Sequence, residues 1–459
     1  MGAVTVLCAV RGAAETDVVV ALGAPGSGAT VTRRCGDVAE LLAAAAAGAG
    51  VVALVSGDLP GLDREAVGRL HAAGVRVVAL GDDVAPAPRL HALAVDAVVE
   101  RYDEALLLAA VRDAGAVGSA AAPAGGRDHL VLGRVADDAD DPLAARDARG
   151  LDDVVADDAA PRRGSVVAVW GPVGAPGRTT TALELAAVLG GLSRGRRRHG
   201  RARREAAASA ASESALLVDA DTYGASMAAR LGLLDDAPGL AAVARAAAHG
   251  SLDLPTLARH SPVVGGRLRV LTGIARAARW PELPASALEV VLERARELAD
   301  WTVVDCGPLL EADELLMYDT HAPQRNGATL AALQAADVVV VVGAADPVGV
   351  QRLVRGLEDL REVPVPVAGE RVVVANRVRA SAAGPRPEAA VREALARYAG
   401  VEDVHVVPDD AAGLDAALLA GRTLVEEVPG SPVAGAFEEL ARRVRATVAA
   451  AVPAASLAG

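Results

Sequence analysis

Short apolar runs alternate with helix-like segments along the first quarter of the chain. This alternation is typical of a parallel, doubly wound sheet with helices on its faces. We therefore expect residues 1–118 to form a small flavodoxin-like α/β domain. The segments that carry the pattern are 4–10, 38–47, 51–55, 64–73, 75–80 and 104–114.

The pattern stops over residues 119–164 and resumes at residue 165. Clusters of Ala, Gly, Pro and Asp fill the interruption, as is typical of an acidic flexible linker. Beyond it, apolar runs with the length of buried strands predict one large α/β domain over 165–450, with a mostly parallel, doubly wound sheet. A packed helix at 433–448 and a short tail at 451–459 are expected to end the chain. The strand-like runs lie at 166–170, 216–218, 268–271, 302–304, 338–342, 372–375 and 404–407.

The composition narrows the class of protein. Hydrophobic residues make up 52% of the 459 residues but aromatic residues only 2%, so the core must be built from Val, Leu and Ala. The chain has 46 basic and 59 acidic residues, a net charge of −13, which argues against a protein that binds nucleic acid with its whole surface. It contains no lysine, so every basic residue is an arginine. Three cysteines without metal-ligand spacing, and apolar stretches shorter than the roughly 18 residues of a membrane span, predict a soluble cytoplasmic protein.

A glycine-rich turn, Gly171-Pro-Val-Gly-Ala-Pro-Gly-Arg-Thr-Thr, joins the first strand of the larger domain to a helix. A loop in this position points backbone N–H groups and a helix N-terminus at one spot, which is how a chain holds phosphates. The loop departs from the pattern G-x-x-x-x-G-K-[ST], because Pro172 stands at the first glycine and Arg178 at the lysine. A purely structural glycine turn is the alternative interpretation.

Polar residues follow four later strands of the same domain. Asp219 and Asp221 end one predicted strand and Asp305 another, while Asn376 and the Pro408-Asp409 segment end two more. The carboxyl ends of parallel strands meet at one edge of a sheet. We therefore expect these residues to converge on one nucleotide.

These motifs, in this order over residues 165–445, resemble the MinD/ParA family of deviant Walker-A ATPases. The family signature K-G-G-x-G-K-[ST] is matched by the segment from Val173 to Thr179. With an α/β domain in front, the architecture is similar to the CpaE-like and septum-site-determining (Ssd) subgroup. The resemblance implies ATP or ADP with Mg²⁺, bound by Gly174, Ala175, Gly177, Arg178, Thr179, Thr180, Asn376, Pro408 and Asp409.

The resemblance also implies a role for each polar group. Thr179 is expected to ligate Mg²⁺, Asp219 and Asp305 to hold it through water, and Asp221 to orient the attacking water as the catalytic residue. Asn376 and the Pro408-Asp409 segment are expected to contact adenine.

Both lysines that define the family's chemistry are missing. Arg178 replaces the loop lysine, and Val173 replaces the signature lysine that reaches across a dimer. Pro176 also removes one N–H from the loop. Loss of one preorganised donor costs about 2.7–4 kcal/mol of transition-state stabilisation in other enzymes, so we expect slow or absent hydrolysis. A site that no longer binds nucleotide is the alternative.

The front domain resembles a response-regulator receiver around residues 51–63. If Leu59-Pro60-Gly61 is the turn after the receiver's third strand, Ser56 stands at the position of the phosphorylated aspartate. Arg11 follows the first strand in place of an acidic pair, and Glu100-Arg101 follows the last strand without the receiver's lysine. The resemblance therefore implies a pseudo-receiver used for docking, with Asp58 as a shifted acceptor the alternative.

Seven arginines are concentrated between Arg194 and Arg204, within a segment (193–215) that is an insertion relative to the family. A solvated loop is one interpretation, and contact with an anionic membrane or nucleic acid is the other.

The resemblance implies a positioning or regulatory protein acting in septum-site determination or Tad/Flp-type pilus assembly. Its partners would be proteins of the division or pilus and secretion machinery, with a homodimer and peripheral association at the inner face of the membrane as further expectations. The alternatives are a catalytically inactive adaptor of the same fold and a ParA-like nonspecific DNA-binding partition protein.

Overall fold

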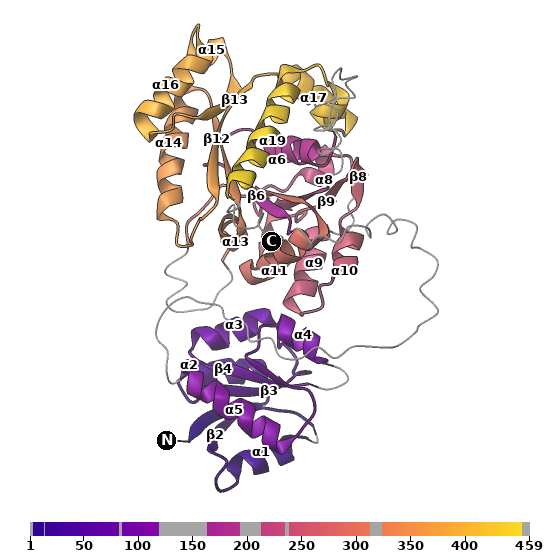
Figure 1. The fold of residues 1–459 in the computed structure, drawn as a ribbon, viewed down its shortest axis with the longest axis vertical. Coiled ribbons are helices and arrows are strands. Elements are labelled where there is room, and N and C mark those ends of the chain that lie inside the picture. The colour runs from indigo at the N-terminus through magenta and orange to yellow at the C-terminus, as the bar shows by residue number, and fades with distance from the viewer. Residues whose placement is uncertain are drawn as a thin grey trace, which may run out of the picture.

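The computed structural model describes residues 3–12, 14–81, 85–118, 163–192, 213–234, 238–312 and 324–451. The expected linker up to residue 162, the arginine tract and the tail beyond residue 451 lie outside the described residues. The described chain forms two α/β units, each built on its own sheet (Figure 1).

The first unit has a five-stranded, all-parallel sheet in the order β2-β1-β3-β4-β5. This is the flavodoxin-like strand order, so the predicted fold class of this unit is confirmed. The strands are β1 (Val4–Ala9), β2 (Ala29–Arg34), β3 (Val52–Ser56), β4 (Arg76–Leu80) and β5 (Ala97–Val99).

Helices cover both faces of this sheet, as a doubly wound fold requires. Buried side chains of α2, α3 and α4 pack on one face, and those of α1 and α5 pack on the other. The helices are α1 (Ala14–Gly23), α2 (Val38–Ala46), α3 (Arg64–Ala72), α4 (Ala87–Ala92) and α5 (Glu104–Gly118).

The second unit has an eight-stranded sheet in the order β13-β12-β11-β6-β10-β7-β9-β8. Among the described strands of this sheet, only β8, at one edge, runs antiparallel to its neighbour. All seven predicted runs are strands, and β8 is an addition that the apolar pattern did not indicate. The strands are β6 (Ser165–Trp170), β7 (Ala215–Ala220), β8 (Val263–Gly265), β9 (Leu268–Leu271), β10 (Trp301–Cys306), β11 (Val338–Ala344), β12 (Glu370–Val378) and β13 (Val404–Pro408).

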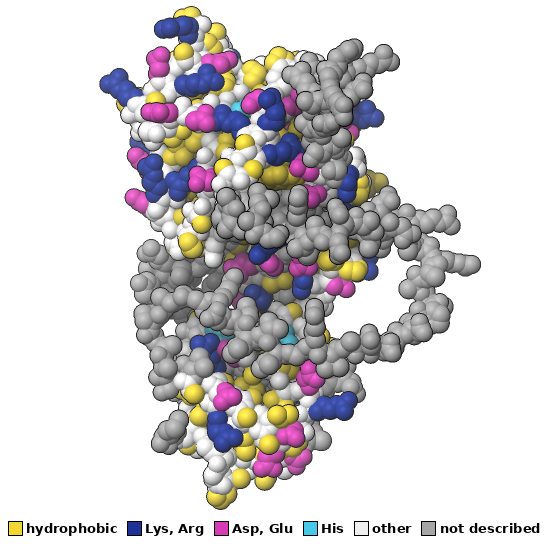
Figure 2. Space-filling model, viewed as in Figure 1, with side chains coloured by type: hydrophobic (Ala, Val, Ile, Leu, Met, Phe, Trp, Pro, Cys, Tyr) yellow, Lys and Arg dark blue, Asp and Glu magenta, His cyan; other side chains and the backbone are white. Residues whose placement is uncertain are grey.

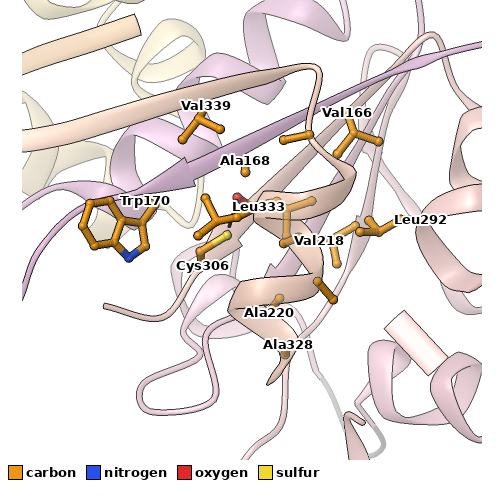
Figure 3. Close-up of a cluster of buried hydrophobic side chains, with 14 of the residues drawn as sticks. Val166, Ala168, Trp170, Val218, Ala220, Leu292, Cys306, Ala328, Leu333 and Val339 are labelled. Atoms are coloured by element: carbon orange, nitrogen blue, oxygen red, sulfur yellow. Dashed lines mark hydrogen bonds between the residues drawn. The ribbon is translucent and has the colours of Figure 1, made fainter. Parts of the chain in front are cut away.

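Two apolar layers sandwich the second sheet. One is formed with α9, α11, α13, α14 and α16, and the other with α6 and α19. Figure 3 shows the first layer, where Trp170 and Cys306 at the strand ends lie near Leu333 of α13. The aromatic content is so low that valine, leucine and alanine fill most of both layers.

The helices of the second unit connect its strands in chain order. The longest, α19, is the packed C-terminal helix that the sequence predicts. They are α6 (Arg178–Leu189), α8 (Met227–Arg230), α9 (Gly239–Ala248), α10 (Leu254–His260), the 3₁₀ helix η1 (Ala277–Glu282), α11 (Ala285–Leu298), α13 (Gly327–Ala335), α14 (Pro347–Glu362), α15 (Ala380–Ala383), α16 (Pro387–Ala399), α17 (Ala411–Ala420), α18 (Leu424–Glu427) and α19 (Pro432–Ala451).

Arg89 of α4 links the turn after β3 to the second unit. Its Nη1 donates to the carbonyl of Gly57 at 2.8 Å, and its Nε donates to the carbonyl of His249, which caps α9, at 3.2 Å. Helix α3 also contacts α9 and α11. None of the helices in the described ranges is long and apolar enough to cross a membrane.

Candidate functional site

The glycine-rich loop leads from β6 directly into α6. Gly177 caps the helix with a left-handed backbone (φ +94°), and a Cβ added there would lie 2.0 Å from Nδ2 of Asn376. A side chain at this position is therefore excluded twice, by conformation and by contact. The close approach of loop and strand end requires glycine here.

The first turn of α6 leaves backbone donors free. Within the described residues, no protein group accepts a hydrogen bond from the N–H of Arg178, Thr179 or Thr180. Unpaired N–H groups at a helix N-terminus, together with the helix dipole, attract phosphate. Two further loop positions offer no free N–H donor to a phosphate. Pro176 has no N–H, and the N–H of Ala175 already donates to the carbonyl of Pro172 at 2.9 Å.

Two buried aspartates face each other beside this helix terminus. The parallel register of β10 and β7 pairs Asp305 with Asp219, and each is 1% exposed. One oxygen of Asp219 accepts from the N–H groups of Ser226 and Met227, at 2.9 and 3.0 Å. Within the described residues, its other oxygen and both oxygens of Asp305 accept no hydrogen bond of standard geometry, and the Thr179 hydroxyl lies close to Asp305.

The surroundings of this pair disfavour negative charge. Burial, followed by repulsion from Asp219, raises the pKa of Asp305 well above its usual value, while the Thr179 hydroxyl and the Arg178 guanidinium act in the opposite direction. Burial also raises the pKa of Asp219, to about 6. Buried carboxylates without partners are costly unless a cation or proton joins them.

These orphaned oxygens fit a divalent cation. In the described part of the chain, no group of three or more His, Cys, Asp or Glu side chains could hold a metal ion by itself. A magnesium ion here would therefore depend on the Thr179 hydroxyl, on ligand oxygens and on water between the ion and the two carboxylates.

Arg178 turns inward, under the loop. Its Nη1 donates to the carbonyl oxygens of Gly171 and Pro172, at 3.3 and 3.5 Å, and its Nη2 lies 3.8 Å from Oδ2 of Asp221. Its Nε is buried and has no hydrogen-bond partner among the described residues. The arginine at the lysine position is thus held by protein oxygens of the loop and of β7's end.

Asp221 is held in place by backbone donors. Its Oδ1 accepts from the N–H groups of Tyr223 at 2.8 Å and Gly224 at 3.2 Å. The other oxygen faces Arg178, so the expected catalytic carboxylate is fixed and ion-paired.

Asn376 at the end of β12 reaches the loop. Its Nδ2 donates to the carbonyl of Pro176 at 2.9 Å. The next residue, Arg377, adopts φ +60°, which is uncommon for a residue with a side chain, and its Nε lies 3.3 Å from Oδ1 of Asp409. Strain at such a position often marks a functional segment.

A cavity of about 260 Å³ opens beside Gly177 and Thr180. Asn376 and Arg377 line it, whereas Pro408 and Asp409 are not among its lining residues. Of the strand-end groups expected at adenine, the structure therefore brings Asn376 to the cavity wall and places Asp409 against Arg377. A larger cavity of about 620 Å³ lies between α14 and α16, and none of the predicted site residues lines it.

Three residues of this region were not predicted. Arg230 lines the smaller cavity and its Nη1 donates to the Thr180 hydroxyl at 3.4 Å. Glu184, on α6, is buried and accepts from the N–H groups of Leu424 and Val425, at 2.7 and 3.3 Å. Arg377 follows Asn376 in the sequence and was the only one of the three that a motif could have indicated.

Comparison with known proteins returns structural likeness alone. No protein-family model and no curated protein matches the chain. The chain is similar to the ParA family ATPase of Chlorobium tepidum (16% identity, 62% of this chain and 99% of that chain, TM-score 0.47). It is also similar to the cell division ATPase MinD of Pyrococcus furiosus (19% identity, 62% of this chain and 99% of that chain, TM-score 0.45). A third similar structure is the septum site-determining protein MinD of Pyrococcus horikoshii complexed with Mg-ADP (18% identity, 61% of this chain and 96% of that chain, TM-score 0.45). At such identities, the chemistry of this chain must be argued from its own residues.

Proposed function

We propose that this chain binds ATP or ADP with Mg²⁺ at the loop between β6 and α6. The observation that carries the proposal is the meeting of free N–H groups at the start of α6 with the orphaned oxygens of Asp219 and Asp305. A nucleotide with Mg²⁺ would complete both groups, because its phosphates would accept from the N–H donors and its Mg²⁺ would offset the charge of the carboxylates. Thr179, whose hydroxyl lowers the pKa of Asp305, is the expected direct ligand of the ion.

Thermal unfolding tests this binding. A ligand that binds only the folded state increases the free energy of unfolding by mass action, by about 2.7 kcal/mol when the ligand concentration is a hundred times its dissociation constant. The midpoint of thermal unfolding rises accordingly. We expect Mg-ATP and Mg-ADP to raise the unfolding midpoint of the intact chain, and EDTA to remove most of the increase. An unchanged midpoint at millimolar nucleotide would count against the proposal.

The biological role proposed with this site is that of a MinD/ParA-like positioning protein, CpaE-like or septum-site-determining, acting at the septum or at a Tad/Flp-type pilus. The first unit would be its pseudo-receiver. Ser56 supports this assignment, because its hydroxyl is buried and accepts from the N–H of Arg11 at 2.7 Å, where a receiver needs acidic groups. Asp58, the alternative acceptor, is exposed. Docking partners from the division or pilus machinery, a cytoplasmic location and peripheral membrane association complete the proposal.

A catalytically inactive adaptor is the second candidate. The ion pair between Arg178 and Asp221 favours this candidate, because the residue that replaces the loop lysine then engages the expected catalytic carboxylate.

The third candidate, a DNA-binding partition protein, depends on the tract from Arg194 to Arg204, which lies outside the described residues. On the face shown in Figure 2, arginine and acidic side chains of the second unit are interspersed.

Changing Arg178 to lysine alone is expected to leave hydrolysis slow. Val173 still lacks a charge and Pro176 still lacks an N–H, and one missing donor can cost about 10²–10³ in rate. We expect single-turnover phosphate release by Arg178→Lys to stay within about tenfold of wild type. The matched comparison is the double variant Val173→Lys with Arg178→Lys. A large gain from the single change would refute this account of the loop.

Oligomeric state is expected to be the same with ATP as with ADP. In the family that this chain resembles, a lysine from each subunit reaches the other's phosphates, which links nucleotide to dimerisation, whereas Val173 offers no such contact. Sedimentation velocity with ATP, ADP and no nucleotide measures this. A monomer-to-dimer shift seen only with ATP would show that a residue other than Val173 bridges the subunits.

A further inference from the structure

The phosphate side of the loop lacks a cation from the expected positions. Val173 is apolar and 55% exposed, so the signature position presents no charge. Arg178 is held under the loop by the carbonyl of Gly171 and by Asp221. A side-chain cation for the outer phosphates of a bound polyphosphate would have to come from another position, and because the chain has no lysine, the permanently charged residue available is arginine.

Helix α14 packs directly against this loop. A Cβ added at Gly356 would lie 3.1 Å from Cβ of Pro172 and 3.2 Å from the ring of Trp170, so the helix and the loop are in close contact there. Residues four apart lie on the same face of a helix. Arg352, four residues before Gly356, therefore faces the loop one helical turn nearer the start of α14.

Arg352 covers the second glycine of the loop. A Cβ added at Gly174 would lie 2.0 Å from Nη1 of Arg352, and Gly174 has a left-handed backbone (φ +77°). The guanidinium thus lies beside the residue that follows Val173. Arg352 is exposed, and no ion pair or hydrogen bond joins it to another residue within the described ranges. Its charge is available to a ligand at the loop.

We propose that Arg352 binds the outer phosphates of a polyphosphate ligand, supplying from within the chain the charge that Val173 does not supply. Its forked guanidinium can make two parallel hydrogen bonds to one phosphate. Arg230 lies at the first turn of α6, where it donates to the Thr180 hydroxyl. The proposal rests on the proposed nucleotide site, and it agrees with an oligomeric state that ATP does not control, because the charge comes from the same subunit.

Calorimetric titration of the intact chain with Mg-ATP, Mg-AMP and inorganic tripolyphosphate tests this role. We expect Arg352→Ala to lower the affinity for Mg-ATP and for tripolyphosphate about tenfold, as the loss of a hydrogen bond to a charged group predicts. The affinity for Mg-AMP should stay nearly unchanged. Arg352→Lys keeps the charge and should recover part of the affinity. The control is Arg355→Ala, three residues along the same helix, where the side chain lines the cavity between α14 and α16 instead.

The outcomes separate the two proposals. If the wild type binds tripolyphosphate but not Mg-ATP, and Arg352→Ala loses the binding of tripolyphosphate, the phosphate role of Arg352 is supported and the nucleotide function is overturned. Wild-type binding of Mg-ATP that Arg352→Ala and Arg355→Ala leave equally strong would overturn the role of Arg352 alone. An equal loss of Mg-AMP and Mg-ATP affinity in Arg352→Ala would also overturn it, because the effect would then be independent of the outer phosphates. Absence of binding by either ligand would overturn both.

Discussion

Asp305→Asn is expected to make the ligand-free protein more stable and its nucleotide binding weaker. The wild-type carboxylate is buried with both oxygens unpartnered, and its pKa is raised by burial and by Asp219. Asp305 must either carry an unpaired charge in the folded state or take up a proton on folding, and both cost free energy. Its replacement by Asn should therefore stabilise the fold, by about 1–3 kcal/mol on the scale of buried polar groups in proteins.

The same substitution removes a carboxylate that would hold Mg²⁺ through water. Changes to such outer partners lower metal affinity about 10–100-fold in known sites, and we expect a loss of that size in the Mg²⁺-dependent part of nucleotide affinity. Urea unfolding without ligand measures the stability, and titrations with and without Mg²⁺ measure the affinity. The control is Asp300→Asn at the other end of the same strand, where the carboxylate accepts from the N–H and hydroxyl of Ser214 at 2.7 Å. Lower stability in both variants would contradict the argument.

Glu184 is expected to make the second unit less stable as the pH rises. Burial raises the pKa of Glu184 from 4.5 to about 7, against the lowering effect of the N–H groups of Leu424 and Val425. Between these two values the folded state binds more protons at Glu184 than the unfolded state does, so the contribution of Glu184 to stability is fully present below about pH 4.5 and is lost as the pH rises towards 7. A difference of about 2.5 pKa units corresponds to about 3 kcal/mol at 1.36 kcal/mol per unit.

Glu184→Gln removes this dependence while keeping an oxygen that can accept from Leu424. We expect the variant to be more stable than wild type at pH 8, by about 2–3 kcal/mol, and nearly equal at pH 5. Urea unfolding at pH 5, 6, 7 and 8 gives the difference, and taking variant minus wild type cancels the titration of Asp219 and His405 in the same unit. Glu393→Gln, at an exposed position of α16, is the control. A difference that does not change with pH would show that Glu184 does not titrate in this range.

The strands of both units could largely be predicted because buried parallel strands are continuous apolar runs. Residues 338–342 are five consecutive valines, and all of them are buried. The exceptions are edge strands. The three residues of β8 are partly exposed and too few to make a pattern, and β2 ends in Arg33 and Arg34, whose exposure hides the strand.

The candidate site could be predicted only as far as strand ends define it. Asp219 and Asp305 come together because the register of two neighbouring strands pairs them. Arg352 and Glu184 lie inside helices, and their roles depend on what each one contacts. Arg352 contacts the loop beside Gly174, and Glu184 contacts the start of α18. Those contacts join segments about 180 and 240 residues apart in the chain, and no local pattern specifies such packing.

Direct calorimetry of wild-type protein with Mg-ATP and Mg-ADP tests the central claim most directly. The free N–H groups of α6 and the unpaired carboxylates of Asp219 and Asp305 predict saturable binding of both nucleotides that weakens when Mg²⁺ is removed. No heat of binding with either nucleotide at millimolar concentration, from protein shown to be folded, would contradict it and leave the loop a structural turn.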